Sequence, residues 1–357
     1  MKILIRADGA PEIGVGHLTR CLTLAVALKS NGHEIKFLMT DHSGNFSSIV
    51  TKDGFEVVFV SRGEGYQKPV TGKESTWLGN ELSYELIEAN KVIEKYNPDL
   101  AIVDHYGLDA AWEKEIRKSV KSIFVIDDLA NRAHDCDYLL DQTFGRTNLD
   151  YIKLVPAGCK FFLGSDYALL RPEFSRSVPF RTSLKKIFVS FGGSDPRGIT
   201  LKIIQGIELE QKTKMHITVI LREDSLGYEE VKNITQNSIH HYEHLSSTNK
   251  MADLMASADL AFGAGGTSAW ERCAVSLPAI GVQLADNQKL VLENLSRKGA
   301  LINIGDFQTV TPDVVYSTLR IILENESFLN AMSKASHEVC DGQGVDRVAA
   351  IFPPGKA

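Results

Sequence analysis

KILIRADGAPEIGVGHLTRCLTLAVAL, residues 2–28, combines a strand, a loop and a helix in one continuous stretch. An apolar run over 3–5 is followed by a glycine-rich loop over 8–16. Apolar residues then recur at spacings of three and four, which predicts an amphipathic helix, and Gly32 is a natural stop just past its end. This order predicts the first unit of a doubly wound α/β fold.

The rest of the first half repeats the alternation of strands and helices. We expect strands near 35–39, 55–60, 100–103 and 123–126. The last two are continuously apolar, as in parallel strands that helices cover on both faces. A helix over about 82–96 should end at Asn97-Pro98, because proline cannot continue a helix.

The second half restarts the same alternation after a break. Prolines, arginines and serines over about 163–182 predict a crossover between domains. Further strands are expected near 187–190, 217–221, 259–262 and 279–282. We therefore predict two Rossmann-like α/β domains that face each other across a cleft. Their expected bounds are 1–175 for the N-terminal domain, 183–345 for the C-terminal domain and 346–357 for a tail.

The composition is that of an ordinary globular protein. With 43% hydrophobic and 24% charged residues among 357, the chain has enough apolar mass for sizeable cores. A net charge of −6 argues against a nucleic-acid or membrane-surface partner, since these favour basic faces. No stretch approaches the roughly 20 apolar residues that span a bilayer, and the N-terminus lacks the apolar core of a signal peptide. We therefore expect a cytoplasmic protein.

The five cysteines are odd in number and far apart in the sequence, at Cys21, Cys136, Cys159, Cys273 and Cys340. No pair has the spacing of a metal or redox motif, and a secreted disulfide framework needs more cysteines in a shorter chain. We expect all five to be reduced and most of them to be buried.

The loop before the first helix contains Gly14, Gly16 and His17. The glycines let the backbone approach a ligand, and the helix N-terminus presents free N–H groups. A dinucleotide fingerprint needs a third glycine at position 19, where Thr19 stands, so an NAD site is not expected. The helix dipole disfavours a protonated imidazole, so His17 is a candidate proton acceptor. By position alone, it is equally well a histidine that caps or packs at the domain edge.

Two glycine-rich turns of the second half each follow an apolar strand and precede a helix. The first contains Gly192 and Gly193, and the second contains Gly265, Gly266 and Thr267. Two such turns at the carboxyl edge of one sheet predict a binding site for a diphosphate. One turn into the second helix lies Glu271, which is placed either to reach ribose hydroxyls or to face solvent.

Two patterns resemble metal sites, and we assign a metal to neither. Asp135-Cys136-Asp137 precedes an apolar strand and is better explained as a turn. The segment 240–244, HHYEH, matches an inverted zinc-protease pattern but lacks the helical apolar period that the pattern needs. The sequence contains no Walker A loop and no nucleophile elbow. We expect no metal and no cofactor.

Several motifs, taken together, resemble one known family. They are Arg6-x-Asp8, Ile13-Gly-Val-Gly-His17 with Arg20, Val103-Asp-His-Tyr-Gly107, Tyr167-Ala-Leu-Leu-Arg171, Phe191-Gly-Gly-Ser-Asp195, Ala264-Gly-Gly-Thr267 with Glu271-Arg272, and Asp286-Asn-Gln288. In order and joint occurrence they resemble the PseG family, the UDP-2,4-diacetamido-2,4,6-trideoxy-β-L-altropyranose hydrolases of pseudaminic acid biosynthesis. The resemblance runs from Lys2 to about Arg347. The second half also looks like the nucleotide domain of MurG-type N-acetylglucosaminyltransferases, which share the GT-B architecture.

The resemblance implies an activity and a set of site residues. His17 would be the general base and water the acceptor, so that hydrolysis at the anomeric carbon inverts its configuration. Tyr106 would line the sugar pocket, and Asp8 or Asp104 would orient His17 or sugar hydroxyls. The residues that would contact the sugar or UDP are Gly14, Gly16, Arg171, Gly192, Gly193, Gly265, Gly266, Thr267, Glu271, Asn287 and Gln288.

Three other readings stay open at this stage. A glycosyltransferase of the same architecture would pass the sugar to an acceptor other than water, and a UDP-sugar 2-epimerase would exchange the proton at C2. A nucleotide-sugar binding protein would bind UDP without turnover. The expected partner in each case is a small-molecule UDP-sugar, and we favour a monomer.

Overall fold

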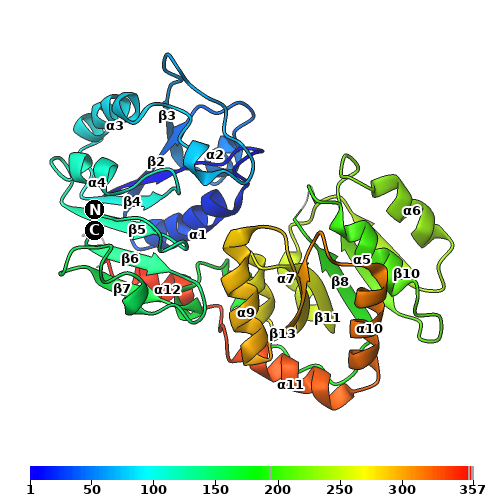
Figure 1. Cartoon of the computed structure of the whole chain (residues 1–357). Coiled ribbons are helices and arrows are strands. Elements are labelled where there is room, and N and C mark those ends of the chain that lie inside the picture. The colour runs from blue at the N-terminus through cyan, green and yellow to red at the C-terminus, as the bar shows by residue number, and fades with distance from the viewer. Residues whose placement is uncertain (193–194, 353, 355–357) are drawn as a thin grey trace. The chain divides into compact units, whose positions relative to one another are not determined.

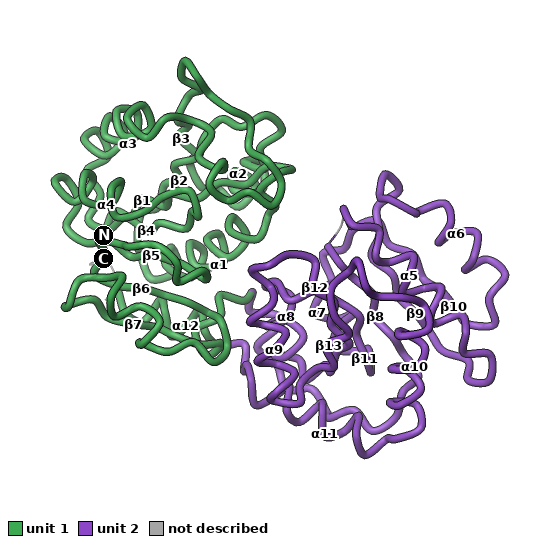
Figure 2. Tube along the Cα trace, viewed as in Figure 1, with its two compact units in different colours: residues 1–170, 343–357 green, residues 171–342 purple. Residues whose placement is uncertain are grey.

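The computed structural model describes residues 1–192, 195–352 and 354, which form two compact α/β units. Unit 1 comprises Met1–Leu170 with Gln343–Ala357, and unit 2 comprises Arg171–Gly342 (Figure 2). Each unit is one parallel sheet with helices on its faces (Figure 1). The predicted architecture of two parallel-sheet α/β domains is therefore confirmed. Within the described residues, no helix is both long and apolar enough to cross a bilayer.

Unit 1 has a seven-stranded sheet in the order β3-β2-β1-β4-β5-β6-β7. The strands are β1 (Lys2–Ala7), β2 (Glu34–Thr40), β3 (Glu56–Val60), β4 (Leu100–Asp104), β5 (Ser122–Ile126), β6 (Tyr138–Asp141) and β7 (Lys160–Leu163). The helices are α1 (Gly16–Ser30), α2 (Ser47–Lys52), α3 (Leu82–Tyr96), α4 (Ala110–Ile116) and α12 (Gly344–Ala349), with short 3-10 turns at Glu74–Thr76, Asn148–Asp150 and Ser165–Tyr167.

Side chains of β1 point alternately to two cores, one on each face of this sheet. Ile3 and Ile5 belong to the core beneath α1, whereas Leu4 belongs to the core beneath α3 and α4. Both faces are buried, which explains why the strands read as continuous apolar runs. Asn97 ends α3 in the left-handed conformation (φ 53°), directly before Pro98. The predicted end of this helix is confirmed.

The C-terminal segment differs from the expected tail over 346–357. Residues 344–349 form α12, which packs against α1 in unit 1. Val345, Val348 and Phe352 are buried in the same core as Ile3 and Ile5. Burial of these apolar side chains against unit 1 stabilises the segment.

Unit 2 has a six-stranded parallel sheet in the order β10-β9-β8-β11-β12-β13. The strands are β8 (Lys186–Ser190), β9 (His216–Ile220), β10 (His241–Leu245), β11 (Leu260–Ala264), β12 (Ala279–Gln283) and β13 (Leu301–Asp306). The helices are α5 (Ile199–Ile207), α6 (Tyr228–Gln236), α7 (Met251–Ser257), α8 (Ser268–Ala274), α9 (Lys289–Lys298), α10 (Pro312–Leu323) and α11 (Glu326–His337), with 3-10 turns η4 (Pro172–Phe174) and η5 (Asp286–Gln288).

Two segments of unit 2 bear on the sequence interpretation. Residues 241–245 form strand β10, so the prediction that the HHYEH segment is not helical is confirmed. In the expected crossover, Arg181 is 5% exposed, and its guanidinium donates to the carbonyl oxygens of Val275 (2.7 Å) and Ala258 (3.0 Å), among others. A buried cation is tolerated there because main-chain oxygens satisfy its N–H groups.

Candidate active site

The loops that follow β1 and β4 meet at one edge of the unit 1 sheet. These strands are neighbours, with Ala7 paired to Asp104 in register. After β1 the chain makes a tight turn, in which the N–H of Gly14 donates to the carbonyl of Ala10 (2.8 Å) and Gly14 has φ +89°. This turn needs glycine because its φ is positive. It places His17 in the first turn of α1, at the carboxyl ends of the strands.

His17 is held by Asp104. Its Nδ1 lies 2.5 Å from Oδ1 of Asp104, whose side chain is fully buried. Nη2 of Arg20 is also 3.3 Å from Nδ1, but the shorter contact is to a carboxylate, which only accepts. We therefore assign the proton to Nδ1. In the neutral ring Nε2 then carries the lone pair, and it has no hydrogen-bond partner among the described residues.

Arg20, one turn further along α1, keeps Asp104 ionised. Its guanidinium contacts both carboxylate oxygens, Nε to Oδ2 at 2.6 Å and Nη2 to Oδ1 at 2.7 Å. Burial alone would raise the pKa of Asp104, but the charge of Arg20 and the contact with His17 outweigh burial and hold the pKa well below its usual range. The remaining Nη1 of Arg20 donates to Oδ2 of Asp128 at 2.5 Å.

Two aromatic rings pack against His17. The ring of Tyr106 is perpendicular to the imidazole with centroids 4.4 Å apart, and the ring of Trp77 is perpendicular at 5.4 Å. The two aromatic rings stack on each other at 5.2 Å, and the hydroxyl of Tyr106 donates to Asp128 (2.9 Å). The structure thus places Tyr106, which we expect to line the sugar pocket, directly against His17. These rings exclude water from one side of the base and fix its orientation.

Asp8, the other aspartate considered as a partner of His17, faces into unit 1. Its carboxylate accepts from the N–H of Thr40 (2.7 Å), pairs with Arg6 (2.7 Å) and contacts His105 Nε2 (3.1 Å). The side chain is fully buried. The structure thus places Asp104 against His17, and it leaves Asp8 without an open face for the substrate contact that we had expected.

The first glycine-rich turn of unit 2 differs from the expected anion cradle. Gly192 has φ +87°, and Gly193 lies outside the described residues. The buried carboxylate of Asp195 accepts from the N–H groups of Ile199 (3.2 Å) and Thr200 (2.8 Å) at the start of α5. The chain therefore caps this helix with its own acidic group, which leaves less of the helix terminus for a phosphate.

The second glycine-rich turn is packed at one glycine and open at the next. A Cβ on Gly265 would lie 2.9 Å from Cγ of Leu292 and 3.0 Å from the carbonyl of Gln288, whereas one on Gly266 would meet nothing within 4 Å. Thr267 precedes α8, and no described side chain caps the start of that helix. Gln288 Oε1 accepts from the N–H of Leu284 (3.0 Å), and Asn287 is exposed.

Arg171 and Glu271 come together in unit 2. Nη2 of Arg171 lies 3.9 Å from Oε1 of Glu271, and its Nη1 pairs with Glu173 at 3.0 Å. Burial raises the pKa of Glu271, and the charge of Arg171 opposes the rise. Nε of Arg171 is buried without a partner in the described chain. Arg171 and Glu271, which were both predicted to contact the substrate, therefore lie close together at helix α8.

Three residues of this cluster have no role predicted from their sequence motifs. Arg20 appeared only within a motif, and its spacing of three from His17 on a helix was the available signal. Asp128 follows the buried strand β5, next to β4, and this position was also a signal. Trp77 lies in the long connection between β3 and α3, where no pattern indicated it.

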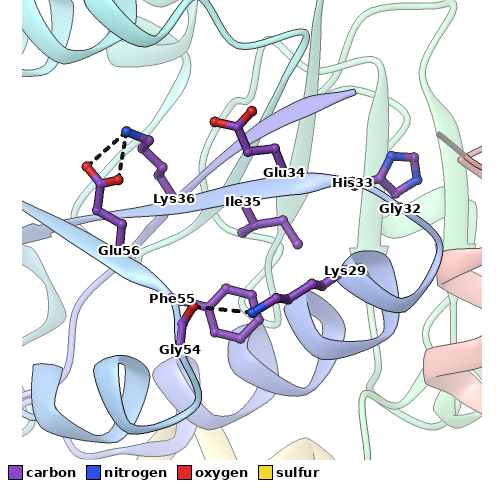
Figure 3. Close-up of a pocket in the computed structure, with 9 residues that line it drawn as sticks. All are labelled: Lys29, Gly32, His33, Glu34, Ile35, Lys36, Gly54, Phe55 and Glu56. Atoms are coloured by element: carbon purple, nitrogen blue, oxygen red, sulfur yellow. Dashed lines mark hydrogen bonds and ion pairs between the residues drawn. The ribbon is translucent and has the colours of Figure 1, made fainter. Parts of the chain in front are cut away.

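A hollow of about 500 Å³ lies elsewhere in unit 1 (Figure 3). It is formed by the end of α1, the start of β2 and the turn before β3, away from the carboxyl ends of the strands. Its Lys36 pairs with Glu56 (2.8 Å), and its Lys29 donates to the carbonyl of Gly54 (3.3 Å). We assign the candidate site to the region of His17 because Nε2 of His17 has no hydrogen-bond partner among the described residues. Lys36 and Lys29 of the hollow, in contrast, already have partners.

Comparisons with known proteins agree with this architecture. Residues 187–347 match the glycosyltransferase family 28 C-terminal domain. The chain is 23% identical to the spore coat polysaccharide biosynthesis protein SpsG of Bacillus subtilis (strain 168), over 99% of this chain and 98% of SpsG. Its fold matches the crystal structure of MurG from Acinetobacter baumannii with a TM-score of 0.70 at 15% identity, over 98% of each chain.

A third relative bears on the resemblance drawn from the motifs. The chain is 30% identical to the UDP-2,4-diacetamido-2,4,6-trideoxy-beta-L-altropyranose hydrolase of Campylobacter jejuni, over 57% of this chain and 64% of the relative. This span is shorter than the one expected from the motifs. The protein thus has the GT-B fold of MurG, and its predicted resemblance to the PseG hydrolases is confirmed.

Proposed function

We propose that this protein hydrolyses a UDP-linked amino sugar at the anomeric carbon and releases UDP. The observation that supports this function most strongly is the 2.5 Å contact between Nδ1 of His17 and the buried carboxylate of Asp104. Nδ1–H donates a hydrogen bond to the buried, ionised carboxylate of Asp104, which leaves the Nε2 lone pair without a partner among the described residues. By resemblance to the Campylobacter relative, we propose 2,4-diacetamido-2,4,6-trideoxy-L-altrose as the sugar product, formed on the route to pseudaminic acid.

In the proposed reaction, water attacks C1 from the face opposite UDP. Nε2 of His17 accepts a proton from this water as the new C1–O bond forms, and Asp104 stabilises the resulting imidazolium. The bond between C1 and the β-phosphate oxygen breaks, and its electron pair leaves with UDP. Direct displacement inverts the anomeric configuration, and no covalent intermediate is required.

We propose that unit 2 binds UDP and that unit 1 supplies the base. The open space beside the backbone at Gly266 supports a diphosphate contact there. Glu271 and Arg171 are the proposed contacts to ribose and phosphate. Asn287 and Gln288 are two further proposed contacts to the UDP-sugar. The chemistry calls on no metal or cofactor. We further propose that the protein acts in the cytoplasm as a monomer.

A second candidate is a glycosyltransferase, and one observation favours it. The match over residues 187–347 is to a glycosyltransferase domain, and MurG has the same fold. Such an enzyme would need an acceptor before it released UDP. Hydrolysis instead predicts stoichiometric UDP release from the UDP-sugar in buffer alone.

The test measures UDP release without any acceptor by wild type and by His17→Asn. The variant should lose about 100- to 10,000-fold in kcat, the usual contribution of a general base, while its affinity for UDP stays near that of wild type. His241→Asn, at an exposed position on β10, is the matched control and should turn over normally. Near-normal turnover by His17→Asn would overturn the assignment of the base, and UDP release only after an acceptor is added would favour the transferase.

A further inference from the structure

Two of the five cysteines meet at the start of neighbouring strands in unit 1. Sγ of Cys136 and Sγ of Cys159 are 3.6 Å apart, in direct contact. Cys136 lies two residues before β6, and Cys159 lies directly before β7. Their separation of 23 positions matches no redox motif, so only the fold brings them together.

The two thiols differ in exposure. Cys136 is 1% exposed, and the N–H groups on either side of it are bonded, that of Asp135 to Glu113 (2.6 Å) and that of Asp137 to the carbonyl of Ile123 (2.9 Å). Cys159 is half-buried at the end of a surface turn closed by its own N–H to the carbonyl of Pro156 (2.9 Å). The accessible thiol is therefore that of Cys159.

The surroundings divide the two thiols into a nucleophile and a resolving group. The hydrogen bond from Cys136 lowers the pKa of Cys159, with help from the charge of Arg117, and the same bond together with burial raises the pKa of Cys136. Arg117 is fixed by Asp135 (2.7 Å) and Asp137 (3.0 Å) on either side of Cys136. Thiolate character and access favour attack by Cys159.

We infer that Cys136 and Cys159 form a reversible disulfide when the protein meets a low-molecular-weight disulfide such as oxidised glutathione. The thiolate of Cys159 attacks one glutathione sulfur, and a glutathione thiolate leaves. Cys136 then gives its proton to that thiolate and attacks the sulfur of Cys159, which expels the second glutathione. The protein loses two thiols, and two molecules of reduced glutathione form.

The bond requires a small movement and has a defined structural effect. The sulfurs, now 3.6 Å apart, must approach by about 1.5 Å to reach a bond length of about 2.05 Å. The bond would tie β7, an edge strand of the sheet, to β6. Closing a loop of this length should raise the Tm of unit 1 by about 5–10 °C. The pair precedes the strands, whereas His17 lies where strands end, so UDP release should be unchanged.

The experiment incubates the native protein in glutathione buffers from reducing to oxidising, blocks free thiols, and counts the blocked thiols by mass spectrometry of the denatured chain. We expect the count to fall from five to three, with a peptide map that joins the segments around residues 136 and 159. Dithiothreitol should restore five, and the Tm should follow the oxidised fraction.

Variants separate the two roles. Cys136→Ser should retain one glutathione per chain on Cys159, and Cys159→Ser should take up none and keep its remaining thiols. Cys273→Ser, a buried cysteine in unit 2, is the matched control and should still form the bond. If Cys136→Ser does not fold, the peptide map of the wild type decides. Five free thiols in the wild type under the oxidising buffer, or a disulfide between other cysteines, would overturn the inference.

Discussion

Replacing Asp104 by asparagine tests how the active site is held together. The carboxylate accepts from His17 at 2.5 Å and from two nitrogens of Arg20 at 2.6 and 2.7 Å. An amide of the same shape has one oxygen and one NH2 group. Whichever way it turns, the NH2 group faces a donor, either Nδ1–H of His17 or the guanidinium of Arg20.

The size of the effect follows from these contacts. Removing one charge of a buried, hydrogen-bonded ion pair costs about 3–5 kcal/mol in the free energy of unfolding. When the NH2 group lies beside Nδ1, where the amide oxygen can still accept from Nε of Arg20, the ring proton moves to Nε2 and the base can no longer accept a proton from water. We therefore expect kcat of the folded variant to fall by about 100- to 10,000-fold, the contribution of a general base.

The assay is UDP release per folded enzyme, with the folded fraction taken from circular dichroism and the stability from urea unfolding. Asp8→Asn is the matched control, because Asp8 is an equally buried carboxylate paired with Arg6 but without contact to His17. It should lose comparable stability and keep a kcat near wild type. Equal kcat values for the two variants would refute the role given to Asp104.

Three further predictions concern stability and UDP binding. Burial lowers the pKa of His105 from 6.5 to about 4, against the opposing effect of Asp8. A histidine with a lowered pKa in the folded state contributes stability that is lost as the pH falls. Between pH 6.5 and 4, the free energy of unfolding of the wild type, measured in urea, should therefore fall by about 3 kcal/mol more than that of His105→Asn. Gly265→Ala should lower the Tm, because its Cβ meets Leu292, whereas Gly266→Ala should keep the Tm and weaken UDP binding in calorimetry; the reverse pattern would contradict the packing. Arg181→Lys should destabilise unit 2 by about 3 kcal/mol in urea unfolding, because a lysine cannot satisfy several buried carbonyls at once, and an unchanged midpoint would contradict this.

Most of the fold could be predicted because strand signals were local. The apolar runs over 3–5 and 100–103 are buried on both faces of the sheet, and such runs need no knowledge of distant contacts. The position of α12 could not be predicted, since its few apolar residues are stabilised by distant parts of the chain, among them α1, more than 300 positions earlier. The same applies to the contact between Cys136 and Cys159.

His17 and Tyr106, which lie together in the structure, could be singled out from the sequence because a motif and a strand end coincide at each, and their roles stay predictions. Asp8 and Asp104 lie at the ends of neighbouring strands and have the same pattern in the sequence. Only the three-dimensional structure shows that Asp104 faces His17, whereas Asp8 faces the interior of unit 1. Asp195 shows a further limit. A glycine-rich turn before a helix indicates an anion site, but an acidic side chain of the chain itself can occupy that helix terminus.

The central claim is that water attacks the anomeric carbon, and oxygen-18 water tests it most directly. The purified protein is incubated with UDP-2,4-diacetamido-2,4,6-trideoxy-β-L-altropyranose and no acceptor, and mass spectrometry and NMR locate the label and the first-formed anomer. We predict label at C1 of the released sugar, none in UDP, and an inverted configuration. Label in the β-phosphate of UDP, or no UDP release at all, would contradict the account.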